Sequence, residues 1–432
     1  MEGVFVLKII CLWMIIMVIP ITNNISLAGE IDIVLDSLIQ VALEKNPDII
    51  AAESNYQAAQ YNKKASGWLP DPIILIAGSN LPYTSLSLGQ TAMSGVSIGF
   101  SQKIPWPSKL SSKKNIAGLK TRERKIAHLA WENKIVRMVK SAYFEFSYWR
   151  LVEDIIDENI LVMKSLAEIA QTKYANGEGL AQDVLSIQTL LSKTEDKRLD
   201  AVNKKKTALA KLNQLTDEPA YKIRDIPAKL PAIDTSLIRL ERLIGEANLK
   251  NPFLGLSSNK FKQASEKRAL AKNNYWPDII FSAEYRFRED APMDAVNGED
   301  FISVRFGLSL PLWFFKKQDN QYKSSIKELS AARISLESVK QQVEYEITTV
   351  SLEIDRYRQG FMLYDEVIIP QAEAALESAN IAYQVGKVDF LNLLTAQLRL
   401  FELQIEELRM LKDYNQTLAT LDEIVGESYG GK

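Results

Sequence analysis

The residue types that most often perform catalysis or bind transition metals are scarce in this chain of 432 residues. His128 is the only histidine, and Cys11 is the only cysteine. The sequence has no pair of these residues at metal-ligand spacing, no Gly-rich phosphate loop and no nucleophile motif. It therefore predicts a protein that is not an enzyme and that carries neither a metal nor a cofactor.

Two carboxylates are notable because each follows a glycine at the start of a helical pattern. Asp183 comes after Gly177, and Asp389 comes after Gly386. A carboxylate near a helix start accepts hydrogen bonds from free backbone amides and interacts favourably with the helix dipole. Helix capping is one interpretation of both residues, and any further role depends on the elements that position them.

Those elements occur twice in the chain. Four landmarks recur in one order at offsets of 205, 207, 206 and 209 residues: Asn46-Pro47 and Asn251-Pro252, Trp68-Leu69-Pro70-Asp71 and Tyr275-Trp276-Pro277-Asp278, Ile104-Pro105-Trp106 and Leu310-Pro311-Leu312-Trp313, and Tyr174-Ala175-Asn176-Gly177 and Tyr383-Gln384-Val385-Gly386. Matches in the same order at nearly one offset predict an internal duplication. We expect two homologous halves of one fold.

The N-terminus has the pattern of a secretory signal. Lys8 precedes an apolar stretch over residues 9–21, and small residues suited to a signal peptidase follow at Ser26-Leu27-Ala28. We expect residues 1–28 to be removed, so that the mature chain begins near Gly29. A single N-terminal anchor helix is the alternative.

Three parts are expected in the mature chain. A first repeat covers residues 29–215, a proline-rich linker covers 216–234, and a second repeat covers 235–432. The formal net charge is -2, and removal of the signal takes away one acid and one base. Because a nucleic-acid partner normally demands a basic face, we expect no nucleic-acid binding.

Four short segments alternate apolar and polar residues, as a strand with one apolar face does. They cover residues 73–79, 96–101, 281–288 and 302–310. Such alternation fits a soluble sheet with one wet face, or a membrane barrel with a lipid face and a watery lumen. The secretory signal favours the barrel, as do the aromatic residues at the strand ends, namely Trp68, Trp106, Trp276, Trp313, Phe314 and Phe315.

A barrel built from these strands requires more than one chain. Four strands cannot close a barrel, and an open sheet edge cannot persist in lipid. Three copies would supply twelve strands, which lies within the range of closed outer-membrane barrels. The loops over residues 81–94 and 289–300 would then face the outside.

Two helical patterns are too long for a compact domain. They cover residues 108–175 and 318–384, and each helix would extend roughly 100 Å. Apolar residues in the first follow the spacing of a coiled-coil seam, at Ile135, Val139, Ala142, Phe146 and Trp149. These helices are expected to pack side by side.

Shorter helices complete each repeat. After the glycine turns, helices are expected to return over residues 180–215 and 388–425, and others should precede the strand pairs from about Asp32 and about Thr235. Pro370 should kink the second long helix, because proline lacks the amide donor and crowds the preceding turn.

With these features the chain resembles the outer membrane factor family, the TolC-like exit ducts of efflux and secretion machines. The resemblance covers essentially the whole mature chain. It implies a mainly α fold with a small β part, in which long coiled-coil helical hairpins form a periplasmic α-barrel. Four strands per chain contribute to a trimeric, twelve-stranded outer-membrane β-barrel. A narrower resemblance to the heavy-metal cation efflux branch rests on residues 69–72, 80–82, 102–107 and Lys109.

The resemblance also implies where the periplasmic tip of the tunnel lies. Tyr174 and Gly177 would form it in the first repeat, and Tyr383 and Gly386 in the second. This tip would dock to a periplasmic adaptor and contain the gate.

In the best-known relatives, acidic residues after the second turn glycine form rings that select cations. The matching positions here are Asn392 and Thr395, and neither is charged. Asp389 and Asp183 are the nearby carboxylates that could take over part of the role. A cation-selective acidic ring is therefore in doubt for this chain.

The implied function is that of a passive exit duct in a tripartite efflux system. It would pass metal cations or drugs from an inner-membrane pump of the resistance-nodulation-division type, through an adaptor (membrane fusion) protein, to the outside. We expect a homotrimer in the outer membrane of a Gram-negative bacterium, with a large periplasmic part. A channel for type I protein secretion is one alternative, because the duct alone does not dictate cargo. A periplasmic coiled-coil adaptor is another, although no lipoyl-like module is visible.

Overall fold

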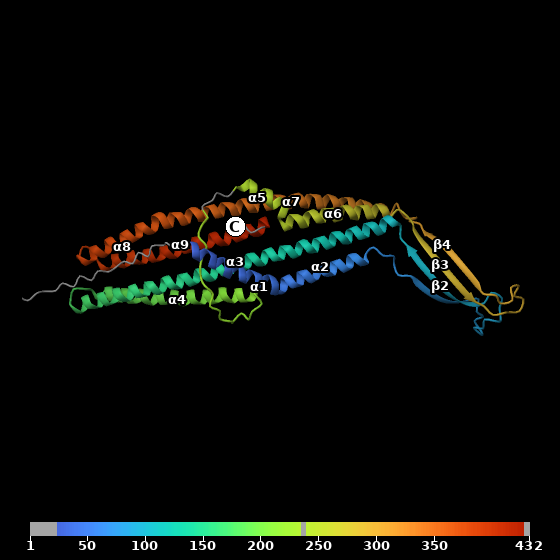
Figure 1. Ribbon diagram of the computed structural model, residues 1–432, viewed down its shortest axis with the longest axis horizontal. Coiled ribbons are helices and arrows are strands. Elements are labelled where there is room, and N and C mark those ends of the chain that lie inside the picture. Colours follow the sequence, from blue (N-terminus) through green and yellow to red (C-terminus); the bar gives the residue numbers. More distant parts are fainter. Residues whose placement is uncertain (1–23, 235–238, 427–432) are drawn as a thin grey trace, which may run out of the picture.

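The computed structural model describes residues 24–234 and 239–426. Figure 1 shows an elongated molecule in which long helices run side by side and a small sheet lies at one end. The helices are α1 (Asn24–Lys45), α2 (Pro47–Ala65), α3 (Pro107–Ala175), α4 (Ala181–Leu215), α5 (Leu240–Lys250), α6 (Pro252–Asn273), α7 (Gln318–Leu363), α8 (Ile369–Gln384) and α9 (Phe390–Val425). A π-helical segment, η1 (Tyr364–Ile368), joins α7 to α8.

The sheet contains β1 (Ile73–Ser79), β2 (Gly95–Ile104), β3 (Asp278–Phe287) and β4 (Phe301–Ser309) in that spatial order. All neighbours are antiparallel. The central pair joins the two halves of the chain, with Ile98 of β2 opposite Tyr285 of β3. The strands predicted from alternation are confirmed, and their boundaries differ from the prediction by no more than a few residues.

The long helices are also confirmed, with one difference in the second. α3 runs through 69 residues without a break, which corresponds to roughly 100 Å. The second run changes to the π-helical segment η1 just before Pro370. The wider π turn accommodates a residue that has no amide donor and a bulky ring. The predicted kink therefore takes the form of a local change in hydrogen bonding within a continuous helical path.

The helices pack side by side in a single row, and the members of that row differ between the part near the sheet and the part away from it. Away from the sheet, α3 packs on α4 and on α9, and α9 packs on α7 and α8. Near the sheet, α3 lies between α2 and α6, and α6 packs on α7 (Figure 1). The predicted seam of α3 is buried at Ile135, Val139, Ala142 and Phe146, with Trp149 packed at its edge. The mainly helical architecture with few strands is thus as predicted.

The two Asn-Pro pairs perform the same structural task in the two halves. Asn46 begins α2 and Asn251 begins α6, and each side-chain oxygen accepts an amide hydrogen bond from the first turn, at 3.0 Å and 2.8 Å. Each side-chain amide donates to the end of a returning helix, Asn46 to the Leu215 carbonyl at 3.1 Å and Asn251 to the Ile424 carbonyl at 2.6 Å. Because of these caps, the single helix expected before each strand pair is divided in two.

The segment between α4 and α5 contains the predicted linker. Residues 216–234 contain no helix or strand, but parts of this stretch are buried. Ile226 and Leu230 lie in the core beside α3, and the Tyr143 hydroxyl donates to the Pro227 carbonyl at 3.0 Å. The segment is therefore packed on the helices as well as connecting them.

Most of the predicted signal, including Cys11, lies outside the described residues. α1 begins at Asn24, so it passes through the expected cleavage position near Gly29. Further along, α1 contributes Leu35, Leu38 and Ala42 to the core. Within the described ranges, no helix combines the length and the apolar character that a membrane crossing requires.

Candidate functional site

The two turns that reverse the helical hairpins are built alike. Gly177 has φ +77° and Gly386 has φ +70°, the left-handed conformation that glycine adopts without strain. In the first turn the amides of Asn176, Gly177 and Glu178 donate to the carbonyls of Thr172, Tyr174 and Lys173, and in the second those of Val385, Gly386 and Lys387 donate to Ile381, Tyr383 and Ala382. The tip residues named from the sequence therefore lie in two matching turns at one end of the molecule (Figure 1).

The two carboxylates near these turns differ in structural role. Asp389 is the N-cap of α9, and its side chain accepts a hydrogen bond from the Asn392 amide at 2.9 Å. Asp183 lies in the first turn of α4, whose N-cap is Leu180. Capping explains Asp389. Asp183 is a partly buried carboxylate that the helix dipole favours at this position.

The two turns contact one another through Lys173 and Tyr383. The Lys173 ammonium lies 4.2 Å from the centre of the Tyr383 ring, within cation–π range. Tyr383 also packs on Phe390 with ring centres 5.7 Å apart, and Phe390 is buried. Tyr174, the matching residue of the first turn, is exposed. The structure thus brings Tyr383 into the contact between hairpins and leaves Tyr174 on the surface.

Asn392 and Thr395 lie three residues apart on α9, on a face that is exposed. The Thr395 hydroxyl donates to the Leu391 carbonyl at 2.7 Å. Leu393 and Leu394, next to them in sequence, turn toward the core. The surface at these two positions is polar and uncharged.

The sheet at the other end of the molecule has an exposed apolar face. Residues that face one another across strands lie on the same side of a sheet, and the register collects Ile98, Phe100, Phe281, Ala283, Tyr285, Ile302, Val304 and Phe306 on one side. Phe306 is 78% exposed and Ile302 is 74% exposed. Such a continuous apolar surface is rare on soluble monomers and indicates contact with lipid or protein.

Exposed aromatic residues gather where the sheet meets the helices. Trp68, Trp276, Trp313, Phe314 and Phe315 are all exposed there. Trp106 and Trp276 stack with ring centres 5.1 Å apart and planes inclined by 9°. Aromatic rings in such a girdle suit the interface between hydrocarbon and water.

The same junction contains an ionic cluster that sequence reasoning missed. Asp278 accepts a hydrogen bond from the Lys109 ammonium at 2.7 Å, and Lys103 lies 3.1 Å from its other oxygen. Lys109 also donates to the Trp276 carbonyl at 2.7 Å. Asp278 and Lys109 both belong to recurring or family-like stretches of the sequence, but no sequence signal pairs them.

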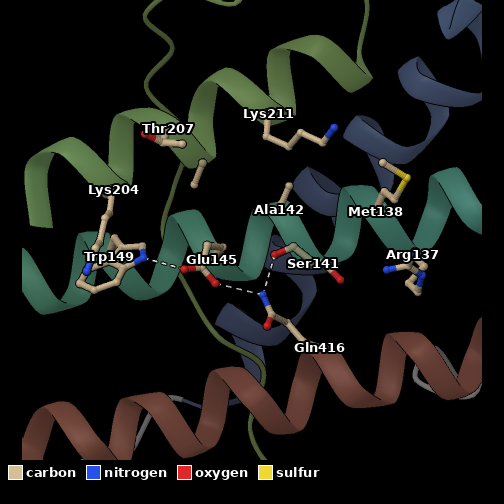
Figure 2. Close-up of a pocket in the computed structure, with 11 residues that line it drawn as sticks. Arg137, Met138, Ser141, Ala142, Glu145, Trp149, Lys204, Thr207, Lys211 and Gln416 are labelled. Atoms are coloured by element: carbon tan, nitrogen blue, oxygen red, sulfur yellow. Dashed lines mark hydrogen bonds between the residues drawn. The ribbon is translucent and has the colours of Figure 1, made fainter.

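A shallow groove lies between the middle of α3 and the C-terminal parts of α4 and α9 (Figure 2). The Trp149 indole and the Gln416 amide both donate to Glu145, at 2.6 Å and 3.2 Å. Gln416 also donates to the Ser141 carbonyl at 3.0 Å. The two hydrogen bonds of Gln416 join α9 to α3, so the residues beside this groove connect the two halves of the chain.

One carboxyl group in the helical region, that of Glu407, has a strongly raised pKa. Burial raises the pKa of Glu407 on α9 to about 7, and the negative charges of Asp365 and Glu373 add to the increase. Asp365 belongs to the π-helical segment before Pro370, and Glu373 to α8. When Glu407 loses its proton near neutral pH, its negative charge therefore appears beside the π-helical segment of the second long helix.

The fold is similar to that of solved, mostly helical outer-membrane channels. The channel OprN has a TM-score of 0.76 at 15% identity, over 91% of this chain and 90% of that chain. CusC gives 0.77 at 14% identity over 92% and 93%. VceC of Vibrio cholerae gives 0.76 at 18% identity over 91% and 96%. At these identities the likeness shows the fold.

Sequence comparison identifies the family. Residues 243–427 match the family of outer membrane efflux proteins. The outer membrane protein TolC of Vibrio cholerae is 22% identical over 401 residues, which are 91% of this chain and 90% of that protein. The cobalt-zinc-cadmium resistance protein CzcC of Cupriavidus metallidurans is 26% identical over 176 residues, 41% of this chain and 40% of that protein.

Residues 243–427 thus carry a domain of the outer membrane efflux protein family, a family of channel proteins. Its location is the outer membrane, with a large periplasmic part. The family and the location predicted from the sequence are both confirmed. The likeness to CzcC and CusC is consistent with the heavy-metal branch.

Proposed function

We propose that this chain is the outer-membrane exit duct of a tripartite efflux system. Three copies form a twelve-stranded barrel that continues into a tunnel of helices. The duct passively conducts metal cations or drugs that an inner-membrane pump of the resistance-nodulation-division type delivers through a periplasmic adaptor. The two halves of each chain, residues 29–215 and 235–432, are duplicated repeats.

The open sheet is the observation that carries this proposal. Within the described residues, β1 and β4 each pair on one side only, so each leaves a row of backbone donors and acceptors unused there. An apolar face with such edges is stable in lipid only if the edges are paired. Pairing β4 of one copy with β1 of the next satisfies both edges and places the apolar face of every copy toward lipid.

Exposed apolar residues on the outer helices of each row support the same assembly. α7 exposes Ile334, Tyr345 and Leu352, and α4 exposes Leu185 and Leu199. Neighbouring copies that pack α7 against α4 or α2 would cover these side chains. The stabilisation expected is about 25 cal/mol for each Å² of apolar surface removed from water.

The hairpin ends form the periplasmic tip in this proposal. Tyr174, Gly177, Tyr383 and Gly386 would build the surface that docks to the adaptor. Their support is their position at the end farthest from the sheet (Figure 1) and the matching backbone geometry of the two turns.

The gate is proposed for the first two turns of α4 and α9. Asp183, Asp389, Asn392 and Thr395 all lie there. Because Asp389 serves as a helix cap, the interaction with a passing cation is assigned to Asp183.

The assembly is tested by extraction and mass measurement. We expect the protein in the outer-membrane fraction, released by detergent and not by salt, with the mass of three chains. A salt-soluble monomer would contradict the proposal and would favour a soluble coiled-coil adaptor.

The cargo is tested by deleting the gene and comparing growth on toxic metal ions, dyes and antibiotics. The partial likeness to the cobalt-zinc-cadmium resistance protein CzcC supports metal ions, so we expect selective sensitivity to divalent metals that the restored gene corrects. Sensitivity to drugs alone would assign the duct to a multidrug pump. Unchanged tolerance with loss of a secreted protein would indicate type I secretion.

A further inference from the structure

The charged residues of the four described strands all lie on one face of the sheet. They are Lys103, Asp278, Glu284, Arg286 and Arg305. On β3, every second residue from Asp278 to Arg286 lies on the face opposite the apolar one. Lys103 pairs with Ile280 and Arg305 pairs with Ser282, so both lie on that same face. In a closed barrel with lipid outside, this face lines the lumen.

Each carboxylate on this face is bound by two cations. Glu284 lies 2.5 Å from Arg305 and 3.4 Å from Arg286. Asp278 lies 3.1 Å from Lys103 and 2.7 Å from Lys109, which belongs to the start of α3. Both groups therefore carry one positive charge more than they carry negative charges.

The cationic side chains are also more exposed than the carboxylates, which makes the surface of this face more positive. The side chains of Glu284 and Asp278 are only 15% and 16% exposed, whereas those of Arg305 and Lys103 are 62% and 50% exposed. The carboxylates are covered by their partners, and the cations project into the space beside the sheet. A solute that passes this face meets positive charge first.

We infer that the barrel section of the duct favours anionic solutes, and that Arg305 and Lys103 determine this preference. The inference rests on the proposed function, because it requires this face to line a closed lumen. Three copies would ring the lumen with these exposed cations, and low-dielectric walls concentrate such a field. The carboxylates proposed for the gate, Asp183 and Asp389, lie at the end of the molecule away from the sheet, many Debye lengths from this face, so they do not cancel its field.

The electrostatic potential beside the charged face can be measured with charged thiol reagents, and this measurement does not depend on whether the tip is open. Ser303 lies on the charged face opposite Glu284 and next to Arg305 along that face of β4. The Ser303→Cys variant of the full chain, in lipid nanodiscs, is reacted with two methanethiosulfonate reagents, one carrying a sulfonate and one a trimethylammonium group. Each rate is divided by the rate of the same reagent with free 2-mercaptoethanol. The unsubstituted chain gives the background.

The sulfonate reagent should react faster than the ammonium reagent, by a ratio on the order of three- to tenfold. Adding Arg305→Gln or Lys103→Gln should reduce the ratio, and Arg305→Glu should bring it near or below one. Arg333→Gln, an exposed arginine on α7, is the matched control and should leave it unchanged. Because a shifted thiol pKa affects both reagents equally, the ratio reports the charge that they meet.

Other results separate the failure of this inference from the failure of the proposed function. Equal normalised rates at Ser303→Cys, with Val304→Cys protected by lipid, would overturn the anion preference and leave the duct intact. Fast reaction at Val304→Cys, on the opposite face, would show that both faces are wet and would overturn the barrel itself. A ratio below one, or no reaction at Ser303→Cys with either reagent, would also overturn the inference.

Discussion

Lys109 and Asp278 lie 2.7 Å apart although 169 residues separate them in the chain. Lys109 stands in the first turn of α3, and Asp278 is the first residue of β3. Their side chains are only 11% and 16% exposed. This pair therefore fixes the start of the first long helix to the strand of the other half, at the level where the helical region joins the sheet.

Replacing Lys109 by methionine should weaken that junction. The change keeps the length of the side chain but leaves Asp278 with one cation fewer in a sheltered place. We expect a loss of about 3 kcal/mol in unfolding free energy, because breaking one side of a buried pair exposes the desolvation cost of the other. The measurement is the unfolding midpoint of the purified assembly.

The matched control is Lys113→Met, on an exposed position of the same helix. It should change the midpoint very little, since exposed charges contribute at most a fraction of a kcal/mol. Equal midpoints for the two variants would show that the Lys109 pair contributes no stability.

Alanine at Asn46 and at Asn251 should destabilise the two halves by similar amounts. Each asparagine caps a helix and also satisfies a carbonyl at the end of a returning helix. We expect about 2 kcal/mol for each substitution, since a cap and a buried hydrogen bond are lost together. Chemical denaturation measures the effect, with the exposed Asn62→Ala as the control. A loss no larger than that of the control would refute the shared role.

Alanine at Gly177 or Gly386 should cost about 1–2 kcal/mol, through backbone strain alone. Both glycines have positive φ, and a Cβ at either position would meet nothing within 4 Å. Gly245 in α5 also has open space but not a positive φ, so Gly245→Ala should instead stabilise by up to about 1 kcal/mol. Thermal unfolding of the three variants tests whether the first two substitutions lower the stability and the third raises it. Stabilisation by Gly177→Ala would contradict the turn geometry.

The Glu407 carboxyl should make stability fall as pH rises toward neutrality. Its folded-state pKa is raised to about 7 by burial and by the nearby Asp365 and Glu373, above the usual value of about 4.3. The folded state therefore binds the proton more tightly than the unfolded state. The associated stability is fully present below about pH 4.3 and is lost as pH passes through 7.

Glu407→Gln should remove this dependence and raise stability at pH 8 by on the order of 2 kcal/mol. At pH 4 the variant and the original chain should unfold alike. Glu337→Gln, at an exposed position of α7, serves as the control. The same pH profile for the Glu407 variant and the original chain would show that another group dominates this range.

The sequence by itself determined the strands, the long helices and their order, but not the division of the short helices before the strands or the π-helical segment. Period-two alternation over residues 302–310 and the seam through Ile135 and Val139 identified strand and helix, because burial on one face imposes that spacing on the residues themselves. The two glycine turns were also visible, since few residues other than glycine tolerate positive φ.

The tertiary structure decided which distant residues meet. The Lys109–Asp278 pair, the contact of Lys173 with Tyr383 and the caps from Asn46 and Asn251 to returning helices depend on how the halves align side by side. Local spacing contains no information on such alignment. Likewise, the alternation of β3 and β4 placed their charges on one face, but only the pairing of the strands showed that the carboxylates are covered and the cations exposed.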